Sequence, residues 1–431
     1  MTLTKTLNLI TMGCSKNLVD SEHLASYAAR AGYRVIFDSN RLNSDTIVIN
    51  TCGFIGDAKK ESIDMILRAV NAKQKGKVKH LYVIGCLSER YKEELREEIP
   101  EVDDYFGARS LKEIIYTLGA KAQNEKHVRR LQSTPKHYAY LKISEGCDWM
   151  CGYCAIPLIR GRHRSVPIET LLEEAQNLAD SGVKELIVVA QDSTFYGMDL
   201  YGKRMLAKLL KSLCKIEEIK WIRLHYAYPT DFPEDVIEVI ASEKKICNYI
   251  DIPFQHISDN MLLAMRRRHT KQDALSLIEK LRKRIPDIAI RTTLMVGYPT
   301  ETEQDIEELC DFVQKTKFER LGVFTYSEEE GTYSATKLLD NISEDEKQRR
   351  KEIIMEMQRE VSSQRNNALL GKEIEVMIDY KEGEFYIGRT YADSPEVDGE
   401  VIISSTRRLH KGCIYLATIT AAEEYDLYAT I

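Results

Sequence analysis

Short apolar runs alternate with helical patterns along the first part of this chain, and this alternation constrains its fold more than any other feature. Such a pattern argues for a parallel β-sheet covered by helices. The helical patterns begin near Asn17, Asp57 and Ser88. The predicted strands are Lys5–Thr11, Tyr33–Phe37, Asp45–Asn50 and Leu81–Gly85.

Three cysteines, Cys14, Cys52 and Cys86, each lie just past one of these predicted strands and just before a helix. The carboxyl ends of parallel strands share one edge of a sheet, where ligands bind. We therefore expect these cysteines to converge in space, although 38 and 34 positions separate them in the sequence. Each alone would more often be an ordinary buried thiol. A small or turn-forming residue beside each one favours a cluster-binding loop instead.

A second series of strands and helices follows. Six such units are too few for a closed eight-stranded barrel, so we expect an open, partial (βα)6 barrel. Helical patterns fill its gaps at Pro167–Ser181, Lys203–Leu213 and Gln272–Arg284. The predicted strands are Tyr138–Ser144, Glu185–Ala190, Lys220–His225, Tyr249–Phe254, Ala289–Val296 and Arg320–Tyr326.

The C-terminal part has a different pattern. A charged helix from about Ser343 to Asn367 leads out of the barrel, and the remainder alternates apolar and polar residues between Gly turns, as small all-β barrels do. Its predicted strands are Glu373–Tyr380, Phe385–Tyr391, Glu400–Ser404 and Cys413–Thr420. A polar, basic stretch at Lys121–Lys136 predicts a linker. We expect an N-terminal α/β domain at 1–122, the barrel at 133–365 and the β-barrel at 366–431.

Three further cysteines, Cys147, Cys151 and Cys154, follow the first strand of the second series at the spacing C-x3-C-x2-C. Three thiolates so spaced can hold three irons of a cubane cluster and leave the fourth iron without a protein ligand. A zinc site completed by His163 and buried structural thiols are the alternatives. Zinc usually takes four ligands, commonly from paired C-x2-C units, so the spacing favours an iron–sulfur site.

With Tyr153 before its last cysteine, this triplet resembles that of the radical S-adenosylmethionine (SAM) enzymes. In that superfamily the open iron chelates S-adenosylmethionine, whose reductive cleavage yields a radical that abstracts hydrogen. The upstream strings Met-Gly-Cys-Ser-Lys-Asn, Asn-Thr-Cys-Gly-Phe-Ile and Ile-Gly-Cys-Leu-Ser-Glu-Arg look like the methylthiotransferase family. The resemblance covers essentially the whole chain. It implies a second 4Fe-4S cluster on Cys14, Cys52 and Cys86, a TRAM-type C-terminal barrel, and conversion of a C–H bond to C–SCH3.

Two branches of that family differ in substrate: one modifies an adenosine in tRNA, the other the β-carbon of an aspartate in ribosomal protein S-twelve. The strings Gly-Cys-Ser-Lys-Asn, Gln-Asp-Ser-Thr-Phe-Tyr-Gly at 191–197 and Val-Phe-Thr-Tyr-Ser at 323–327 are similar to the ribosomal-protein branch. The tRNA branch typically reads Gly-Cys-Gln-Met-Asn at the first cysteine. We therefore expect S-twelve, or the small ribosomal subunit, as the partner. The alternatives are tRNA modification and a non-catalytic iron–sulfur protein.

The distribution of charge supports the same choice. The last 66 residues, from Asn366 onward, hold six Lys or Arg and twelve Asp or Glu, which accounts for the whole net charge of −6. A barrel that grips tRNA would be basic, because phosphate neutralisation supplies most of the affinity. An acidic barrel suits a basic ribosomal protein, although a local basic patch at Arg407, Arg408, His410 and Lys411 is compatible with the count.

We also expect cofactor contacts at the barrel mouth, besides Tyr153. Gly297 and Glu301 lie in Gly-Tyr-Pro-Thr-Glu, which resembles the family's adenosylmethionine-contacting loop. Gln191 and Asp192 end the second strand and Gln255 follows the fourth, where polar side chains face the mouth. Each could instead be a turn or cap. No catalytic residue is expected beyond the cluster ligands.

Three arginines after the triplet, Arg160, Arg162 and Arg164, either line this mouth, bind a carboxylate or form a solvated loop. An apolar content of 43% and a charged content of 30% are typical of globular proteins. No apolar run approaches the roughly 18 residues that span a bilayer, and the N-terminus lacks a signal-peptide pattern. We therefore expect a cytoplasmic protein without a membrane segment. Because the chain contains no dedicated electron donor, a flavodoxin or ferredoxin partner is implied.

Overall fold

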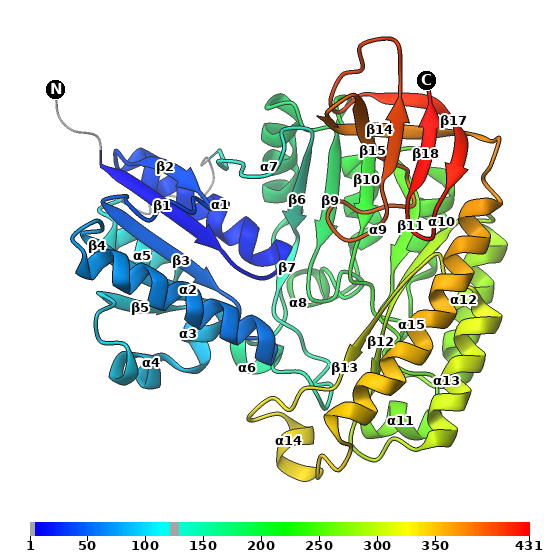
Figure 1. Ribbon diagram of the computed structural model, residues 1–431, viewed down its shortest axis with the longest axis horizontal. Coiled ribbons are helices and arrows are strands. Elements are labelled where there is room, and N and C mark those ends of the chain that lie inside the picture. Colours follow the sequence, from blue (N-terminus) through cyan, green and yellow to red (C-terminus); the bar gives the residue numbers. More distant parts are fainter. Residues whose placement is uncertain (1–4, 121–128) are drawn as a thin grey trace.

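The computed structural model describes residues 5–120 and 129–431, which form three successive parts (Figure 1). The first is a sheet with helices, the second a larger open barrel, and the third a small β-barrel. The predicted linker at Lys121–Lys136 lies partly outside the described residues, and residues 129–136 contain no helix or strand.

The N-terminal part is a parallel sheet with helices on both faces. In the described residues its strand order is β2-β1-β3-β4-β5. Alternate side chains of β3 point to opposite layers: Ile47 and Ile49 pack with α2, and Val48 packs with α1. The strands are β1 (Thr6–Thr11), β2 (Arg34–Phe37), β3 (Thr46–Thr51), β4 (His80–Gly85) and β5 (Asp104–Gly107). The helices are α1 (Ser15–Arg30), α2 (Gly56–Gln74), α3 (Cys86–Arg90), α4 (Lys92–Glu98) and α5 (Leu111–Thr117).

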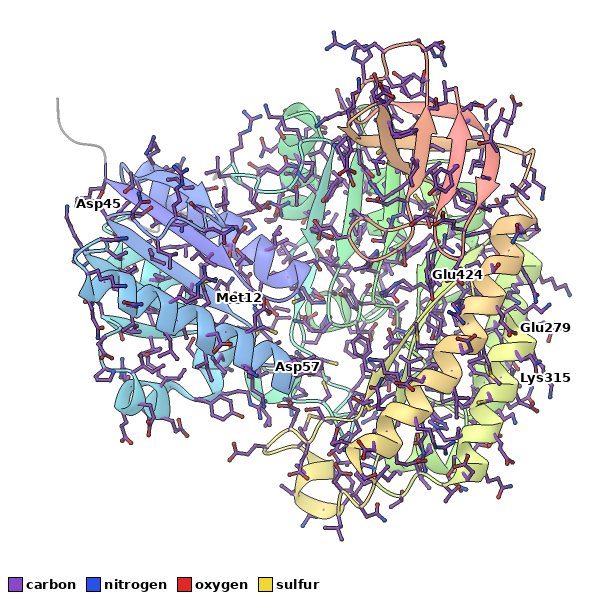
Figure 2. All side chains as sticks on the ribbon, viewed as in Figure 1. Met12, Asp45, Asp57, Glu279, Lys315 and Glu424 are labelled. Carbon is purple, nitrogen blue, oxygen red and sulfur yellow. The ribbon has the colours of Figure 1, made fainter. Side chains whose placement is uncertain are left out.

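The carboxyl edge of this sheet faces the middle part of the molecule. Figure 2 shows Met12, which follows β1, and Asp57, at the start of α2, on that side. Asp45, which precedes β3, lies at the opposite end. The loops that carry the three upstream cysteines therefore point toward the barrel.

The middle part is an open sheet, as the sequence predicted. Its order in the described residues, β13-β12-β11-β10-β9-β6, follows the chain, and every neighbouring pair is parallel. The strands are β6 (Tyr138–Lys142), β9 (Glu185–Val189), β10 (Trp221–Leu224), β11 (Ile246–Asp251), β12 (Ala289–Val296) and β13 (Arg320–Thr325); β7 (Ser144–Glu145) and β8 (Arg164–Ser165) form a separate two-stranded antiparallel sheet. The helices are α6 (Ile156–Ile159), α7 (Ile168–Asp180), α8 (Met198–Tyr201), α9 (Leu206–Leu213), α10 (Glu234–Ser242), α11 (Asp259–Ala264), α12 (Lys271–Arg284), α13 (Glu303–Thr316) and α14 (Tyr333–Lys337).

The two faces of the open barrel pack against different partners. Leu186 and Val188 of β9 belong to the large core beneath the helices. Ile187 and Val189 point the other way and pack with Val19 of α1, a helix of the N-terminal part. Helix α1 of the N-terminal part thus packs against the inner face of the open barrel at β6 and β9.

A long helix, α15 (Glu344–Asn367), runs along β13 and leads to the third part (Figure 1). That part is a closed barrel of order β14-β15-β16-β18-β17 in the described residues. Its strands are β14 (Glu373–Glu382), β15 (Phe385–Arg389), β16 (Val401–Ser404), β17 (Ile414–Ala422) and β18 (Leu427–Thr430). The sequence prediction had missed β18, as it had missed the edge strand β5.

Candidate active site

The upstream cysteines lie at the carboxyl ends of β1, β3 and β4, which are neighbours in the sheet. Cys14 precedes α1, Cys52 follows β3, and Cys86 is the first residue of α3 rather than a residue before it. Their loops touch. A Cβ added to Gly13 would lie 2.8 Å from Cys52 Cβ, and one added to Gly53 would lie 2.8 Å from the carbonyl carbon of Cys86. The expected convergence of the three loops is therefore present.

The three thiols differ in exposure: Cys14 is exposed, Cys52 is half-buried and Cys86 is buried. Burial, reinforced by Cys14 and Cys86, raises the pKa of Cys52 to about 11. Burial also raises the pKa of Cys86, although Arg160 opposes the shift. Thiols bind metals as thiolates, so loading a cluster here would release protons.

The second triplet lies on a loop that hydrogen bonds hold at both ends. The Cys147 N–H donates to the Gly161 carbonyl at 3.1 Å, and the Gly152 N–H donates to the Met265 carbonyl at 2.8 Å. The Gly152 carbonyl in turn accepts the Ser334 N–H at 2.9 Å. A Cβ at Gly152 would lie 2.8 Å from the Tyr298 hydroxyl, so this close approach requires glycine.

A buried arginine lies against this triplet. Arg267 Nη1 donates to Tyr153 Oη at 3.4 Å and lies 3.7 Å from Cys151 Sγ. Its guanidinium also stands 4.2 Å from the centroid of the Tyr228 ring, and Tyr228 Oη is 3.7 Å from the same Cys151 Sγ. Burial raises the pKa of Cys147 to about 12 and also raises that of Cys154. A cation at this place compensates thiolate charge, which fits a cluster site.

Asp192 is satisfied by protein groups. Its Oδ2 accepts the indole N–H of Trp149 at 2.6 Å, and its Oδ1 accepts the Thr194 N–H and hydroxyl at 2.8 and 2.7 Å. Trp149 stacks on Tyr228, with the ring centroids 4.2 Å apart. Asp192 thus holds the aromatic wall of the mouth.

Gln191 leads to a buried charge network. Its Nε2 donates to Glu145 Oε1 at 2.7 Å, while Gln191 Oε1 is buried without a hydrogen-bond partner in the described part of the chain. Arg160 Nη1 donates to Glu145 Oε2 at 3.0 Å and to Asp20 Oδ2 at 2.8 Å. Burial by itself would raise the pKa of Glu145. The positive charges of Lys142 and Arg160 have the larger effect and hold the pKa of Glu145 at about 2.

Arg160 also reaches the upstream cysteines, because its Nη2 lies 3.4 Å from Cys86 Sγ. Of the alternatives raised by the sequence, carboxylate binding is the one that applies to Arg160, and its carboxylate partners belong to the protein itself. Arg164, in contrast, is exposed.

The loop after β12 is held by Glu301. Glu301 Oε2 accepts the Gly297 N–H at 2.7 Å and Arg350 Nη1 at 2.7 Å. His256 Nδ1 accepts two backbone N–H groups, so its Nε2 carries the proton and faces Glu301 Oε1 at 3.3 Å. Gln255 has a positive φ of 70°, and its main chain bonds to β12. Glu301 therefore fixes the shape of this loop.

The two cysteine sets meet at one junction. Cys86 packs with Ala155, the residue after Cys154, and with Ile159 of α6. Lys16, two residues after Cys14, places its Nζ 3.3 Å from the centroid of the Tyr226 ring. Tyr226 lies two residues before Tyr228, so one short loop touches both the Cys14 region and Cys151.

Two ion pairs join the N-terminal part to the loop after β13. Glu329 Oε2 accepts Lys59 Nζ at 2.9 Å and Arg90 Nη1 at 2.6 Å. The Glu329 side chain is 3% exposed, so water screens these pairs little. Together with the Asp20–Arg160 pair, they hold the N-terminal part to the barrel at two places.

A zinc site completed by His163 is not formed in the described residues. In the described residues no group of three or more His, Cys, Asp or Glu side chains is placed to hold one metal ion. His163 Nε2 is instead 3.1 Å from Ser165 Oγ. In a 4Fe-4S cluster each thiolate binds a different iron, so the ligands need not converge on a single point. Two sets of three free thiols, in loops that glycines bring close, fit such groups.

Family profiles divide the chain much as the fold does. The radical SAM superfamily matches residues 141–313, the uncharacterized protein family UPF0004 matches residues 6–107, and a TRAM domain matches residues 370–431.

Curated relatives match over almost the whole chain. The ribosomal protein uS12 methylthiotransferase RimO of Bacteroides thetaiotaomicron is 51% identical over 428 residues, which cover 99% of this chain and 98% of that protein. The protein of the same name from Porphyromonas gingivalis is 51% identical over 427 residues, with 99% and 98% covered. The chain belongs to the uS12 methylthiotransferase family. The resemblance found in its cysteine contexts is confirmed.

Solved structures share the fold of this family member at low identity. The radical S-adenosylmethionine methyltransferase TsrM from Kitasatospora setae has a TM-score of 0.55 and 12% identity, and 75% of each chain is covered. The cobalamin-dependent S-adenosylmethionine radical enzyme OxsB has a TM-score of 0.52 and 14% identity, with 82% of this chain and 56% of that chain covered.

Sequence reasoning missed several residues of this methylthiotransferase. The structure adds Arg267 beside Cys151, the stacked Trp149 and Tyr228, and Lys16 on Tyr226. Trp149 lies within the cysteine spacing itself and was a signal available in the sequence. The sequence contains no local signal for Arg267 or Lys16, because their roles depend on contacts with distant loops.

The charge of the C-terminal barrel is less exposed than its sequence count implied. Asp379 pairs with His137, Asp393 with Arg320 and Asp398 with Arg291, all in the middle part. Among the barrel's exposed residues, seven are acidic and five are Lys or Arg. The acidic surplus therefore serves docking within this methylthiotransferase as well as its outer surface.

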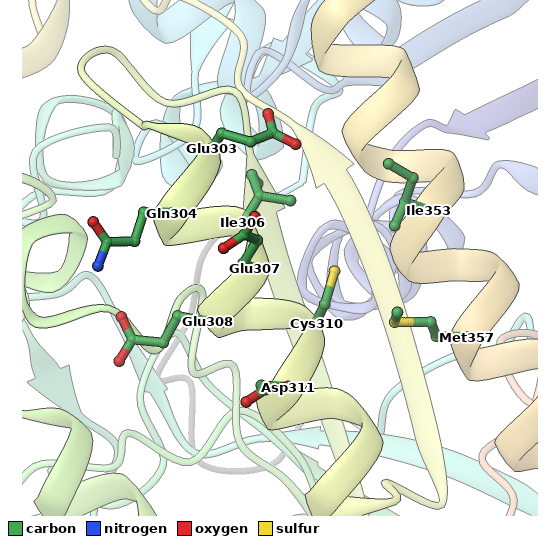
Figure 3. Close-up of a pocket in the computed structure, with 9 residues that line it drawn as sticks. All are labelled: Glu303, Gln304, Ile306, Glu307, Glu308, Cys310, Asp311, Ile353 and Met357. Atoms are coloured by element: carbon green, nitrogen blue, oxygen red, sulfur yellow. The ribbon is translucent and has the colours of Figure 1, made fainter.

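An open groove lies elsewhere, between α13 and α15 (Figure 3). It is lined by acidic and apolar side chains and by none of the six cysteines discussed above, so it is separate from the candidate site. The structure also bears on a membrane segment: in the described residues no helix is both long and apolar enough to cross a bilayer.

Proposed function

We propose that this protein adds a methylthio group to the β-carbon of an aspartate in ribosomal protein uS12. The observation that carries the proposal is the junction at which two separate sets of three cysteines meet, with Cys86 packed on Ala155. Sulfur insertion at an unactivated C–H bond needs a radical source and a sulfur source close to the same carbon. The full-length relatives named for uS12 support this substrate rather than tRNA.

Membership of the radical SAM superfamily implies one 4Fe-4S cluster and S-adenosylmethionine. In the proposal, Cys147, Cys151 and Cys154 hold that cluster. When bound, it supplies the electron that cleaves S-adenosylmethionine to the radical that abstracts hydrogen. Arg267 and the buried wall around Tyr153 keep water from this place.

The proposal assigns a second 4Fe-4S cluster, the source or carrier of sulfur, to Cys14, Cys52 and Cys86. Arg160 then lies against one of its ligands and balances thiolate charge.

The remaining cofactor contacts of the proposal fall into two kinds. Gln191 contributes its Oε1, which has no partner in the described residues and can accept a cofactor group, and Tyr153 contributes from a buried position against Arg267. Gln255 presents its side chain from a strained turn at the end of a barrel strand. Asp192 and Glu301 act through the groups they hold, the Trp149 wall and the Gly297 loop.

The proposal also includes the three domains at 1–122, 133–365 and 366–431, a cytoplasmic location, and an electron donor such as flavodoxin or ferredoxin.

Iron content tests the cluster assignment. After anaerobic reconstitution, two 4Fe-4S clusters correspond to about eight irons per chain. Replacing Cys14, Cys52 and Cys86 by Ala should leave about four irons and S-adenosylmethionine cleavage, but no methylthiolation. Replacing Cys147, Cys151 and Cys154 should also leave about four irons and abolish cleavage. Cys413→Ala, at an exposed cysteine, is the matched control. An unchanged iron content in the upstream triple variant would remove the second cluster from the proposal.

The mass of uS12 tests the substrate. A strain that lacks the gene should contain uS12 without its methylthio group, and reintroducing the gene should restore the mass. Loss of methylthioadenosine from tRNA, with uS12 unchanged, would assign the protein to the tRNA branch instead.

A further inference from the structure

Lys16 is a buried cation two residues after Cys14. It lies in the first turn of α1 and is 8% exposed. Its Nζ stands 3.3 Å from the centroid of the Tyr226 ring. In the part of the chain that the structure describes, no carboxylate forms a salt bridge with it. Acidic groups of the same region pair elsewhere: Asp20 with Lys142 and Arg160, and Asp251 with Arg291.

Lys16 differs in its pairing from two of the neighbouring buried cations. Removing an ammonium group from water is unfavourable unless an opposite charge or good hydrogen bonds replace the water. An aromatic face attracts a cation but compensates only part of that loss. Two other buried cations of this junction, Lys142 and Arg160, each contact two carboxylates, whereas Arg267 contacts Cys151 and Tyr153 and, in the described residues, forms no carboxylate pair. Lys16 has no carboxylate partner of this kind in the described residues, so besides balancing charge at Cys14 it can bind an anion that another molecule provides.

Its position shows where that anion would lie. Lys16 follows Cys14 by two residues, and the Tyr226 ring it covers belongs to the loop after β10. Two residues further along this loop, Tyr228 Oη is 3.7 Å from Cys151 Sγ. Lys16 therefore stands between the two cysteine sets. In the proposed function, the target carbon has to lie in this same place to meet both.

We propose that the Lys16 ammonium group binds the side-chain carboxylate of the target aspartate. This inference rests on the proposed function. The carbon that receives sulfur is bonded directly to the carboxylate carbon, so holding the carboxylate fixes the C–H bond that must react. A site with a buried unpaired cation also discriminates strongly against an uncharged analogue, because binding the analogue leaves the cation unpaired.

The test compares two substrates on three proteins. The substrates are uS12 and its variant with Asn at the modified position. The proteins are the reconstituted wild type, Lys16→Met, which keeps the length of the side chain without its charge, and Lys60→Met, at an exposed position of α2. Dissociation constants are measured by calorimetry, and methylthiolation by intact mass.

We expect the wild type and Lys60→Met to bind the Asp form at least about tenfold more tightly than the Asn form. Lys16→Met should bind both forms equally, at the wild-type affinity for the Asn form. Lys16→Arg should retain part of the preference. If Lys16→Met weakened binding of the Asp and Asn forms equally, or still bound the Asp form more tightly, Lys16 would not be the group that binds the carboxylate.

Two further outcomes of these measurements also bear on the proposal. If Lys16→Met loses iron, the wild-type comparison still decides, because a wild type that binds Asp and Asn forms equally contradicts the proposal. If the wild type binds uS12 with the Asp preference but adds no methylthio group, the proposed function fails while Lys16 retains its role in binding.

Discussion

Glu185 joins the open barrel to the C-terminal barrel, and its replacement by Gln tests how that joint is stabilised. It is the first residue of β9 and is fully buried. Its Oε1 accepts Arg223 Nε at 2.8 Å, and its Oε2 accepts Arg389 Nη2, from β15, at 2.8 Å. Glu185→Gln keeps the shape of the side chain but leaves two buried guanidinium groups with less opposite charge.

The magnitude follows from the burial of this ion pair. Removing one partner of a buried pair costs about 3–5 kcal/mol, because the remaining charge stays buried. Asp379 still contacts Arg389 at 2.6 Å and retains part of the compensation, so we expect about 3 kcal/mol. With a urea slope of about 2 kcal/mol per M, the midpoint should fall by about 1.5 M.

Tryptophan fluorescence provides the assay. The chain has two tryptophans, and Trp221 packs with Met377 of β14 at this joint. In a Trp149→Phe background, fluorescence therefore reports undocking of the C-terminal barrel. Glu384→Gln, at an exposed position of the same barrel, is the control and should shift the midpoint by less than about 0.5 M.

The loss of stability caused by Glu185→Gln should depend on pH. Burial opposes ionisation of Glu185, but Arg389 and Arg223 outweigh it and lower its pKa below 4.5. A lowered folded-state pKa contributes stability above the unfolded value that is lost as pH falls through the folded value. The difference in urea midpoint between wild type and Glu185→Gln should thus have its full size at pH 7 and become smaller below about pH 4.5. Equal midpoints for Glu185→Gln and Glu384→Gln at pH 7 would refute the reasoning.

Two more substitutions test local geometry. Gly13→Ala would place a Cβ 2.8 Å from that of Cys52 at a φ of +91°. If the chain holds the two proposed clusters, we expect this variant to lose about four of about eight irons, measured per chain after reconstitution. Gly32→Ala has a similar φ of +89° with nothing within 4 Å, so equal iron loss there would point to backbone strain instead. Thr302→Ala removes the capping box that pairs Thr302 with Asp305 at the start of α13. It should lower the free energy of unfolding by about 1 kcal/mol in thermal melts, with Thr302→Ser close to wild type.

Much of the fold could be predicted because strand and helix periodicities are local. The strands that carry cysteines were predictable within a few residues, and cysteines at their carboxyl ends had to share an edge. β5 and β18, four residues each, are too short and too mixed in polarity for the pattern to reveal. They are ordered by pairing with β4, and with β16 and β17, which is a tertiary effect.

The site was predictable only as far as its cysteines. Arg160 looked like one member of a basic loop, but it is buried between Asp20 and Glu145 and touches Cys86. That role depends on how two domains pack, which no local periodicity encodes. The same holds for Lys16, whose aromatic partner lies 210 positions along the chain. Net charge likewise missed that part of the barrel's acidity is used in docking.

The ion pairs that Glu329 and Asp20 form between the N-terminal part and the barrel have, in the proposed function, a consequence for the kinetics of sulfur transfer. Two proteins that met anew for each reaction would lose translational and rotational freedom every time. Here that loss occurs once, when the chain folds, and the later step becomes intramolecular. The effective concentration of one cysteine set at the other is then a property of the fold and does not depend on how much enzyme the cell contains.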